Sequence, residues 1–263
     1  MRKPMSNRRR FLGQLGAAAS LLTVGGCDSF DGWLNSGDPL PEFLRKANVL
    51  TREAQRAIGG SAPMAREYPE SAIREAQRPN GSTDPQTADY LAVKENDFAG
   101  YRLHVTGLVD NELSISLDEL RAMPSRTQIT RHDCVEGWSC IAQWTGVQLS
   151  RVLDRAGVKP AARYVVFRCY DPMEETPGGP ALYYESIDLI SARHPQTILA
   201  YGLNGQTLPV ANGAPLRVRI EQQLGYKMAK YIRAIEIVDS FAAIAGGNGG
   251  YWEDRGYDWY AGS

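Results

Sequence analysis

The stretch TRHDCVEGWSC, residues 130–140, brings together several side chains that can take part in chemistry. Cys134 follows Arg131 and His132, and Cys140 ends the stretch. A thiolate can attack a substrate or bind a metal ion, and two thiols can join in a disulfide. A buried cysteine can also pack as a small apolar residue. The residue types alone therefore leave four roles open for Cys134.

The spacing of the cysteines and histidines narrows these roles only in part. Structural zinc sites use ligand pairs at spacings such as C-x2-C or H-x3-H, and no pair in the chain fits. A disulfide between Cys134 and Cys140 would leave Cys169 unpaired. A thiolate pair of Cys134 with His132 lacks an identifiable third residue to orient it. Zinc is thus disfavoured, whereas a disulfide, a nucleophile and a buried thiol stay open.

Residues 1–26 have the composition of an export signal. Three adjacent arginines precede an apolar run, residues 11–26, which is too short and too rich in Ala and Gly for a typical membrane span. This pattern resembles a twin-arginine signal, which serves proteins exported in the folded state, often with a cofactor. The small residues before Cys27 also resemble a lipoprotein cleavage site. We expect a periplasmic or otherwise extracytoplasmic protein, with a lipid anchor at Cys27 left open.

The charge of the chain disfavours one class of partner. Residues 1–26 hold five of the 29 Lys and Arg residues and none of the 30 Asp and Glu residues, which leaves 24 basic against 30 acidic residues after them. An acidic chain without a run of Lys and Arg is a poor candidate for binding nucleic acid. We therefore expect no nucleic-acid partner.

The periodicity of the chain predicts strands with short helices between them. Ser116 is a favourable N-cap for a helix at 116–123, and the apolar spacing of residues 146–157, ended by a glycine, predicts a second helix. Asn204-Gly205 lies between two apolar runs and predicts a hairpin. Strands are expected at 102–109, 126–133, 163–170, 216–220 and 229–240. Because strands dominate without a βαβ rhythm, we expect an α+β fold with mixed β-sheets.

Three segments are expected along the chain. Residues 1–26 form the signal, residues 27–100 form an N-terminal extension and linker that contributes to the domain, and residues 101–263 form the main domain. Within the extension, the irregular stretch 61–85 is rich in Pro and Ser, and long irregular segments tend to be functional. The Gly- and aromatic-rich residues 246–263 are expected to pack as an ordered tail.

The segment CVEGWSCIAQWTGVQLSRVLDRAG, which begins at Cys134, resembles the molybdenum-ligand segment of the sulfite oxidase family. Its C-V-E-[AG]-W-S core is similar to the branch that holds the catalytic subunit of the periplasmic methionine-sulfoxide reductase. Three later stretches agree in order and spacing: YVVFRCYDP (164–172), HPQTILAYGLNGQTLPVANGAPLRV (194–218) and GYKMAKYIRAIEIVD (225–239). The resemblance covers roughly residues 65–240 and implies a sulfite-oxidase-type molybdopterin-binding fold.

The resemblance implies one molybdenum held by a single molybdopterin and by the thiolate of Cys134. A soft thiolate suits a metal that cycles between oxidation states, and metal binding removes the thiol proton. The cofactor's phosphate and pterin edge suit a guanidinium, an ammonium and bare backbone N–H groups. The positions implied to bind the cofactor are Asn80, Cys169, Asn212, Arg217, Lys227, Met228, Ala229 and Lys230.

Four positions near these need separate interpretation. Cys169 stands where the reductase branch has threonine, and Cys140 stands where it has an apolar residue, so the resemblance implies a packed thiol at Cys140. Arg131 and His132 stand just before the implied metal ligand, separated from it by Asp133, and are candidates to face the substrate. A place in the core is an equal alternative for His132.

The resemblance also implies a reaction and a partner. We expect oxygen-atom transfer, with reduction of a sulfoxide-like substrate; the alternatives are sulfite oxidation, for which Arg131 is the nearby cation, and a non-catalytic extracytoplasmic lipoprotein. The chain ends about 25 residues after the last matching stretch, so we expect a monomer without a C-terminal immunoglobulin-like dimerisation domain. Since there is no C-x-x-C-H haem motif, a separate membrane haem protein is the expected electron-transfer partner.

Overall fold

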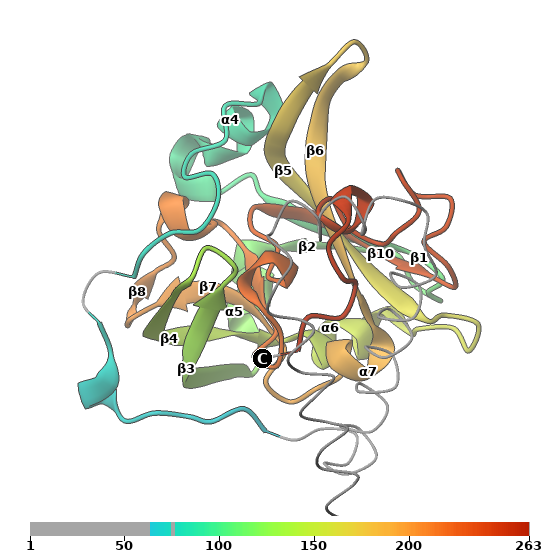
Figure 1. Cartoon of the computed structure of the whole chain (residues 1–263). Helices are drawn as coiled ribbons and strands as arrows, with labels where there is room; N and C mark the ends of the chain where they lie inside the picture. The colour runs from blue at the N-terminus through green and yellow to red at the C-terminus, as the bar shows by residue number, and fades with distance from the viewer. Residues whose placement is uncertain (1–63, 75–76, 263) are drawn as a thin grey trace, which may run out of the picture. The chain divides into compact units, whose positions relative to one another are not determined.

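Ten strands form two five-stranded sheets in the computed structural model, which describes residues 64–74 and 77–262 (Figure 1). In the first sheet the order is β2-β1-β10-β5-β6, and only the β1–β10 pair is parallel. In the second sheet β3, β4, β7 and β8 are neighbours in that order, and β9 pairs with β7. The strands are β1 (Arg102–Gly107), β2 (Leu113–Ser116), β3 (Ser125–Cys134), β4 (Trp138–Gln148), β5 (Tyr164–Thr176), β6 (Gly179–Asp188), β7 (Ile198–Leu203), β8 (Gln206–Thr207), β9 (Arg217–Arg219) and β10 (Ile232–Val238).

The helices of the described residues are short and connect or flank the strands. This combination of mixed sheets and short helices confirms the α+β prediction. The α-helices are α4 (Ala88–Lys94), α5 (Leu117–Ala122), α6 (Leu149–Ala156) and α7 (Leu189–Ala192). The 3-10 turns are η1 (Glu70–Ala72), η2 (Glu95–Phe98), η3 (Val210–Asn212), η4 (Gly225–Lys227) and η5 (Glu253–Arg255).

The helix expected at 116–123 forms as α5 and is capped as its sequence predicts. The Ser116 hydroxyl accepts the backbone N–H of Glu119 at 3.1 Å, and the Glu119 carboxylate accepts the backbone N–H of Ser116 at 2.9 Å. This reciprocal capping box satisfies two of the N–H groups that a helix start leaves without partners. The hairpin predicted at Asn204-Gly205 is also confirmed, because it joins β7 to β8 with positive φ at both residues.

The predicted start of the helix at 146–157 was wrong. Gly146, Val147 and Gln148 continue β4, where they pair with β7, and α6 begins only at Leu149. The reason is close packing between strands: a Cβ at Gly146 would lie 2.1 Å from the backbone oxygen of Leu199. Only glycine lets the two strands approach this closely, so the position belongs to the sheet.

The main core joins the first sheet to α6. Leu149, Val152, Leu153 and Ala156 of α6 are fully buried in one hydrophobic cluster with strand residues such as Phe167. Burial of each large apolar side chain contributes roughly 1.5–3 kcal/mol. Those residues recur on one face of the helix, as the sequence pattern indicated. A smaller cluster surrounds the fully buried Trp144 of β4 under the second sheet.

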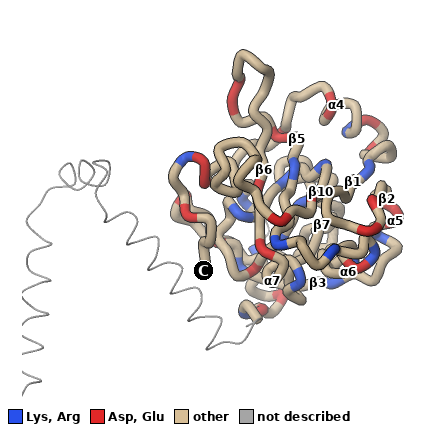
Figure 2. The backbone as a smooth tube through the Cα atoms, turned by 90° about the vertical axis from the view of Figure 1, so that its right-hand side faces the viewer, with Lys and Arg blue, Asp and Glu red and all other residues tan. Residues whose placement is uncertain are grey.

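The C-terminal tail packs on the domain over its described part, as predicted. The backbone N–H of Tyr251 donates to the Tyr184 carbonyl at 3.0 Å, and that of Leu224 donates to the Ala261 carbonyl at 2.9 Å. Charged residues of both signs are interspersed over the described elements (Figure 2). No helix among the described residues is long and apolar enough to cross a membrane. The export signal and the lipid anchor at Cys27 lie outside the described residues.

Candidate active site

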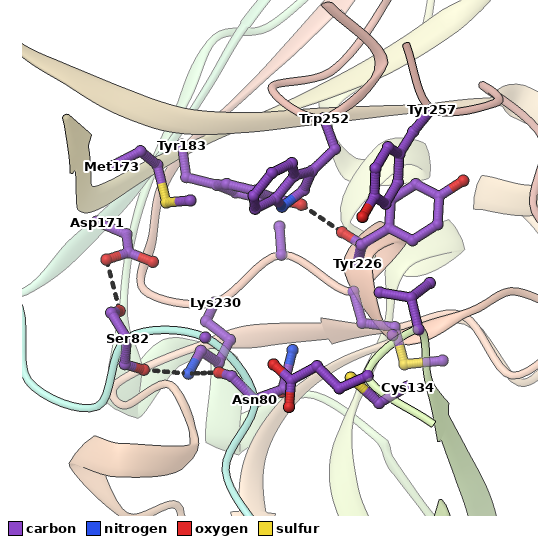
Figure 3. Close-up of a pocket in the computed structure, with 16 residues that line it drawn as sticks. Asn80, Ser82, Cys134, Asp171, Met173, Tyr183, Tyr226, Lys230, Trp252 and Tyr257 are labelled. Carbon is purple, nitrogen blue, oxygen red and sulfur yellow. Dashed lines mark hydrogen bonds between the residues drawn. The ribbon is translucent and has the colours of Figure 1, made fainter. Parts of the chain in front are cut away.

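A cavity of about 240 Å³ lies where the turn after β3, the loop that follows η4 and the C-terminal tail come together (Figure 3). Its wall contains aromatic rings, two methionines, two carboxyl groups and one lysine. The residues that line it are Asn80, Gly81, Ser82, Cys134, Val135, Glu136, Asp171, Met173, Tyr183, Gly225, Tyr226, Met228, Ala229, Lys230, Trp252 and Tyr257. Five of the positions expected to act in the site, Asn80, Cys134, Met228, Ala229 and Lys230, therefore share one cavity.

Cys134 is the last residue of β3, and a tight turn directs the chain from it into β4. The Gly137 N–H donates to the Cys134 carbonyl at 3.0 Å, and Gly137 has φ +83°, which favours glycine. The thiol is half-buried and free, and the buried thiols of Cys140 and Cys169 are free as well. The Cys134–Cys140 disulfide that the sequence left open is therefore not formed. Burial raises the pKa of the Cys134 thiol, and the Glu136 carboxylate acts in the same direction.

Lys230 ties the loop after η4 to the segment that precedes α4. Its ammonium donates to the carbonyls of Asn80 and Ser82, and to that of Ala211 at 3.2 Å. Burial, with a contribution from the nearby Arg217 guanidinium, lowers the pKa of Lys230 to about 7. The Ser82 hydroxyl in turn donates to the Asp171 carboxylate at 2.5 Å. These bonds hold one side of the cavity in place (Figure 3).

Arg217 lies behind this wall, next to Lys230. Gly213, with φ +113°, separates them: a Cβ there would lie 3.0 Å from the Lys230 side chain and 3.2 Å from that of Arg217. Arg217 donates through Nη1 to the Asn212 carbonyl at 2.9 Å, whereas its buried Nε and Nη2 have no hydrogen-bond partner. Burial, with Arg219 nearby, lowers the pKa of Arg217 to about 9. Asn212 itself donates to the Gln77 carbonyl at 3.4 Å.

A family model described as Oxidoreductase molybdopterin binding domain matches residues 90–243. The chain belongs to this family. The match confirms the assignment to sulfite oxidase-type proteins and to molybdopterin-binding oxidoreductases that the motif around Cys134 predicted.

Two relatives show how far the similarity extends. The chain is 45% identical over 171 residues to a putative protein-methionine-sulfoxide reductase subunit, YedZ1, of Azospira oryzae, covering 65% of this chain and 59% of that protein. It is 33% identical over 246 residues to the protein-methionine-sulfoxide reductase catalytic subunit MsrP of Xanthomonas campestris pv. campestris, covering 91% of this chain and 72% of that protein. Among solved structures, the sulfane dehydrogenase SoxCD of Paracoccus pantotrophus matches 54% of this chain and 39% of that one, with a TM-score of 0.47 and 23% identity.

The side chains present in this molybdopterin-binding domain fit a thiolate-bound, anionic cofactor. Cys134 offers a free thiol in the cavity wall, and Arg217 keeps two buried donors without a protein partner. Buried donors of this kind are costly to leave unpaired, so an anion that accepts from them offsets the cost. No group of three or more His, Cys, Asp or Glu side chains within 64–74 and 77–262 is arranged to hold a metal ion.

Lys227 lies apart from the cavity although it is in the same turn as Met228. Its fully buried ammonium forms ion pairs with the carboxylates of Glu185 on β6 and Glu253 in the tail. Burial raises the pKa of Glu185 well above its usual range, with Lys227 opposing and Glu253 adding to the shift. Lys227 is thus paired with two carboxylates from distant parts of the chain.

Cys169 faces a second cavity of about 470 Å³ between the β5–β6 hairpin and residues 245–255. It is 1% exposed, and burial raises its pKa well above the usual range. Tyr183 lines both cavities. Cys169, Asn212, Arg217 and Lys227 are the expected cofactor positions that do not line the cavity of Cys134.

Arg131 and His132, near the end of β3, also lie outside the cavity. His132 is 1% exposed, and its Nδ1 accepts from Arg219 at 2.8 Å. Burial, followed by the neighbouring guanidiniums of Arg219 and Arg217, lowers the pKa of His132 well below its usual range, so it is neutral. Arg131 is half-exposed and pairs with the Asp133 carboxylate at 2.9 Å.

Sequence reasoning missed most of the cavity's aromatic and acidic wall. Asp171 lies near the end of the stretch YVVFRCYDP and Met173 directly follows it, but their types carry no signal of a site. Trp252 and Tyr257 belong to the Gly- and aromatic-rich tail, where the composition gave the only available sign. It did not say which surface the rings would contact.

Proposed function

We propose that this chain is an exported molybdenum–molybdopterin oxidoreductase that reduces a sulfoxide-like substrate by oxygen-atom transfer. The free thiol of Cys134 in the wall of a cavity is the observation that carries the proposal. The two relatives, which are named as protein-methionine-sulfoxide reductase subunits, support the choice of reaction. The substrate sulfur accepts two electrons, and its oxygen leaves as water with two protons.

In this proposal each cofactor-binding group has a defined task. The thiolate of Cys134 binds the metal, and the spare donors of Arg217 bind the anionic end of the cofactor. Lys230 holds its own loop and adds positive charge, while the backbones of Met228 and Ala229 line the cavity. When bound, the cofactor supplies a molybdenum that exchanges an oxygen atom and two electrons.

The charge of the cavity wall supports a neutral sulfoxide over the sulfite dianion. Glu136 and Asp171 both line the cavity, and Lys230 is the single cation among its lining residues. The Lys230 ammonium already donates to three carbonyls. A dianion would have to approach two carboxyl groups without a free cation, which costs electrostatic free energy. Arg131, the cation considered for sulfite, lies outside the wall and pairs with Asp133.

Export and electron supply complete the proposal. The twin-arginine-like residues 8–12 would direct the loaded protein to the periplasm, where a membrane haem protein would deliver the electrons. A tether at Cys27 would raise the effective concentration of the two partners. Fractionation of cells that express the full chain, with Arg8–Arg10 intact or replaced by lysine, tests this part. Retention of the wild-type chain in the cytoplasm would exclude it.

The reaction is tested with the full chain purified from a host that makes molybdopterin. We expect stoichiometric molybdenum, a Mo(V) paramagnetic resonance signal and sulfoxide-dependent oxidation of a reduced dye. Cys134→Ser should lose the signal or change it grossly. Cys140→Ser, on the neighbouring strand, is the matched control and should keep it. Absence of molybdenum from the wild type, or electron release from sulfite without sulfoxide reduction, would overturn the proposal.

A further inference from the structure

Two of the four aromatic side chains that line the cavity lie outside the residues that the family model matches. Trp252 and Tyr257 lie beyond residue 243, where the match ends. With Tyr226 they stand together on one side of the cavity, facing the Cys134 end (Figure 3). The Trp252 and Tyr257 rings have centroids 5.4 Å apart, and Tyr257 meets the Tyr226 ring edge-on at 5.2 Å.

We infer that this C-terminal wall, defined here as Trp252 and Tyr257, determines specificity by selecting sulfoxides that carry an aromatic substituent over small ones. The inference rests on the proposed function and names the substrate class of the same cavity. Aromatic rings interact with one another beyond their burial of area, in offset or edge-on arrangements. An aryl group on the substrate can extend the existing set of rings.

The polar ends of the neighbouring rings are used within the protein. The Tyr183 hydroxyl donates to the Tyr226 carbonyl, and the Tyr226 hydroxyl donates to the Asp258 carbonyl at 2.6 Å. Their ring faces and edges, with the thioethers of Met173 and Met228, are what remains to line the cavity. Such a lining offers apolar and polarisable contact, and methionine sulfur packs favourably against aromatic rings.

A buried charge cluster holds the wall in place. Glu253, next to Trp252, pairs with Lys227, which also pairs with Glu185 of β6. Because Lys227 precedes Met228 in the loop that lines the cavity, one ammonium anchors both the tail and that loop. A Cβ at Gly250 would lie 2.0 Å from the Glu253 carboxylate, so the tail approaches the cluster closely. The wall is therefore fixed before any substrate binds, which lowers the entropic cost of binding.

Two further groups, Arg255 and Asp254, also secure the tail. Arg255 lies 3.6 Å from the centre of the Tyr251 ring and pairs with Glu174 of β5. The Asp254 carboxylate accepts the Tyr184 hydroxyl at 2.5 Å and the backbone N–H groups of Gly246 and Asn248 at 3.0 Å each. None of these contacts uses the rings of Trp252 or Tyr257, so those rings can be changed without removing the anchors.

The test uses the full, molybdenum-loaded chain and two substrates, dimethyl sulfoxide and methyl phenyl sulfoxide. The wild type should have the lower KM for methyl phenyl sulfoxide. Trp252→Ala and Tyr257→Ala should each raise that KM roughly 2- to 10-fold, the range expected for loss of one aromatic contact, and should raise the KM for dimethyl sulfoxide by a smaller factor. Trp252→Phe should restore part of the preference.

Phe241→Ala is the matched control, because this ring packs against Tyr164 at 4.6 Å and Trp259 at 5.7 Å and does not line the cavity. It should leave the substrate preference unchanged. Molybdenum content and melting temperature of every variant confirm that it is folded and loaded. A wild type without preference, or Trp252 and Tyr257 variants that keep the wild-type KM ratio, would overturn the inference.

A second readout separates this inference from the proposed function. Binding of methyl phenyl sulfone, an analogue without a reducible sulfoxide, is measured by titration calorimetry. Its Kd should rise roughly 2- to 10-fold in Trp252→Ala and not in Phe241→Ala. If the loaded wild type reduces neither sulfoxide, the proposed function fails, and the sulfone titration still decides whether the wall binds an aryl group. Equal affinity in the wild type and both wall variants refutes the wall.

Discussion

Gly225→Ala tests whether the cavity depends on the close contact between η4 and β3. Gly225 begins η4, and an ideal Cβ on it would lie 2.6 Å from His132 Nε2 and 2.7 Å from His132 Cε1. The backbone oxygen of Asp133 would be 3.3 Å away. His132 has little room to move, because its other ring nitrogen accepts from Arg219 and its ring packs on Trp138 at 5.4 Å.

The expected cost follows from overpacking alone. Gly225 lies outside the left-handed region, so an alanine there meets no backbone penalty, and only the steric contact counts. Insertion of extra atoms into a packed interior typically costs about 1–3 kcal/mol. For a domain of this size each kcal/mol shifts Tm by about 2–4 °C, so the melting temperature should fall by roughly 2–12 °C. Any relief of the contact moves β3, and Cys134 with it, away from the loop that carries Lys230.

The assay is thermal unfolding followed by circular dichroism, together with the molybdenum content of the purified variant. Gly100→Ala is the control, since a Cβ there has no neighbour within 4 Å and φ is not positive. It should stay within about 0.5 kcal/mol of the wild type. Wild-type melting and wild-type metal content in Gly225→Ala would refute the view that this contact sets the geometry of the cavity.

Three further substitutions separate charge, capping and ligand binding. Burial raises the pKa of Glu185 above its unfolded value, so the contribution of this group to folding stability is present at low pH and is lost as pH rises through the folded pKa. Glu185→Gln can still accept from Lys227, so its Tm should fall less between about pH 5 and about pH 8 than the Tm of the wild type. An equal fall in both proteins would contradict the shift. Ser116→Ala removes the reciprocal cap with Glu119 and should cost about 0.5–2 kcal/mol in urea unfolding; a change below that range would show that the cap is not used in solution. Arg217→Leu should leave the cofactor-free protein as stable as the wild type or more so, and should lower its molybdenum content; a large loss of stability without the cofactor would argue that Arg217 serves the fold.

Local rules predicted the elements whose causes are local. The helix after Ser116 depends on a cap between two residues three positions apart, and the hairpin at Asn204 depends on two residues that tolerate positive φ. The start of α6 was mispredicted because Gly146 is fixed by contact with Leu199, which is far away in sequence. Likewise β4 was not predicted, because the alternating burial of residues 138–145 depends on the pairing of this strand with β3.

The same distinction applies to the site. The motif located Cys134, and the matching loop located Lys230, because each position is tied to a short run of residue types. Nothing in the run GYKMAK could show that Lys227 pairs with Glu185 and Glu253, since those partners are separated from it by 42 and 26 residues. A lysine three positions from another one can therefore have an entirely different task.

Arg217 and Arg219 lie on the same strand, β9, but differ in how their guanidinium groups are hydrogen-bonded. Both guanidiniums lie over the Trp144 ring, at 4.8 Å and 4.5 Å from its centre, and both are fully buried. Arg219 is matched by two hydrogen bonds to Glu221 and one to His132, so its charge is compensated within the protein. Arg217 has one carbonyl partner and two donors without any. A fold selected for stability alone gains nothing from that second buried cation, whereas an anionic ligand that accepts its free N–H groups removes the penalty and stabilises the folded state when it binds.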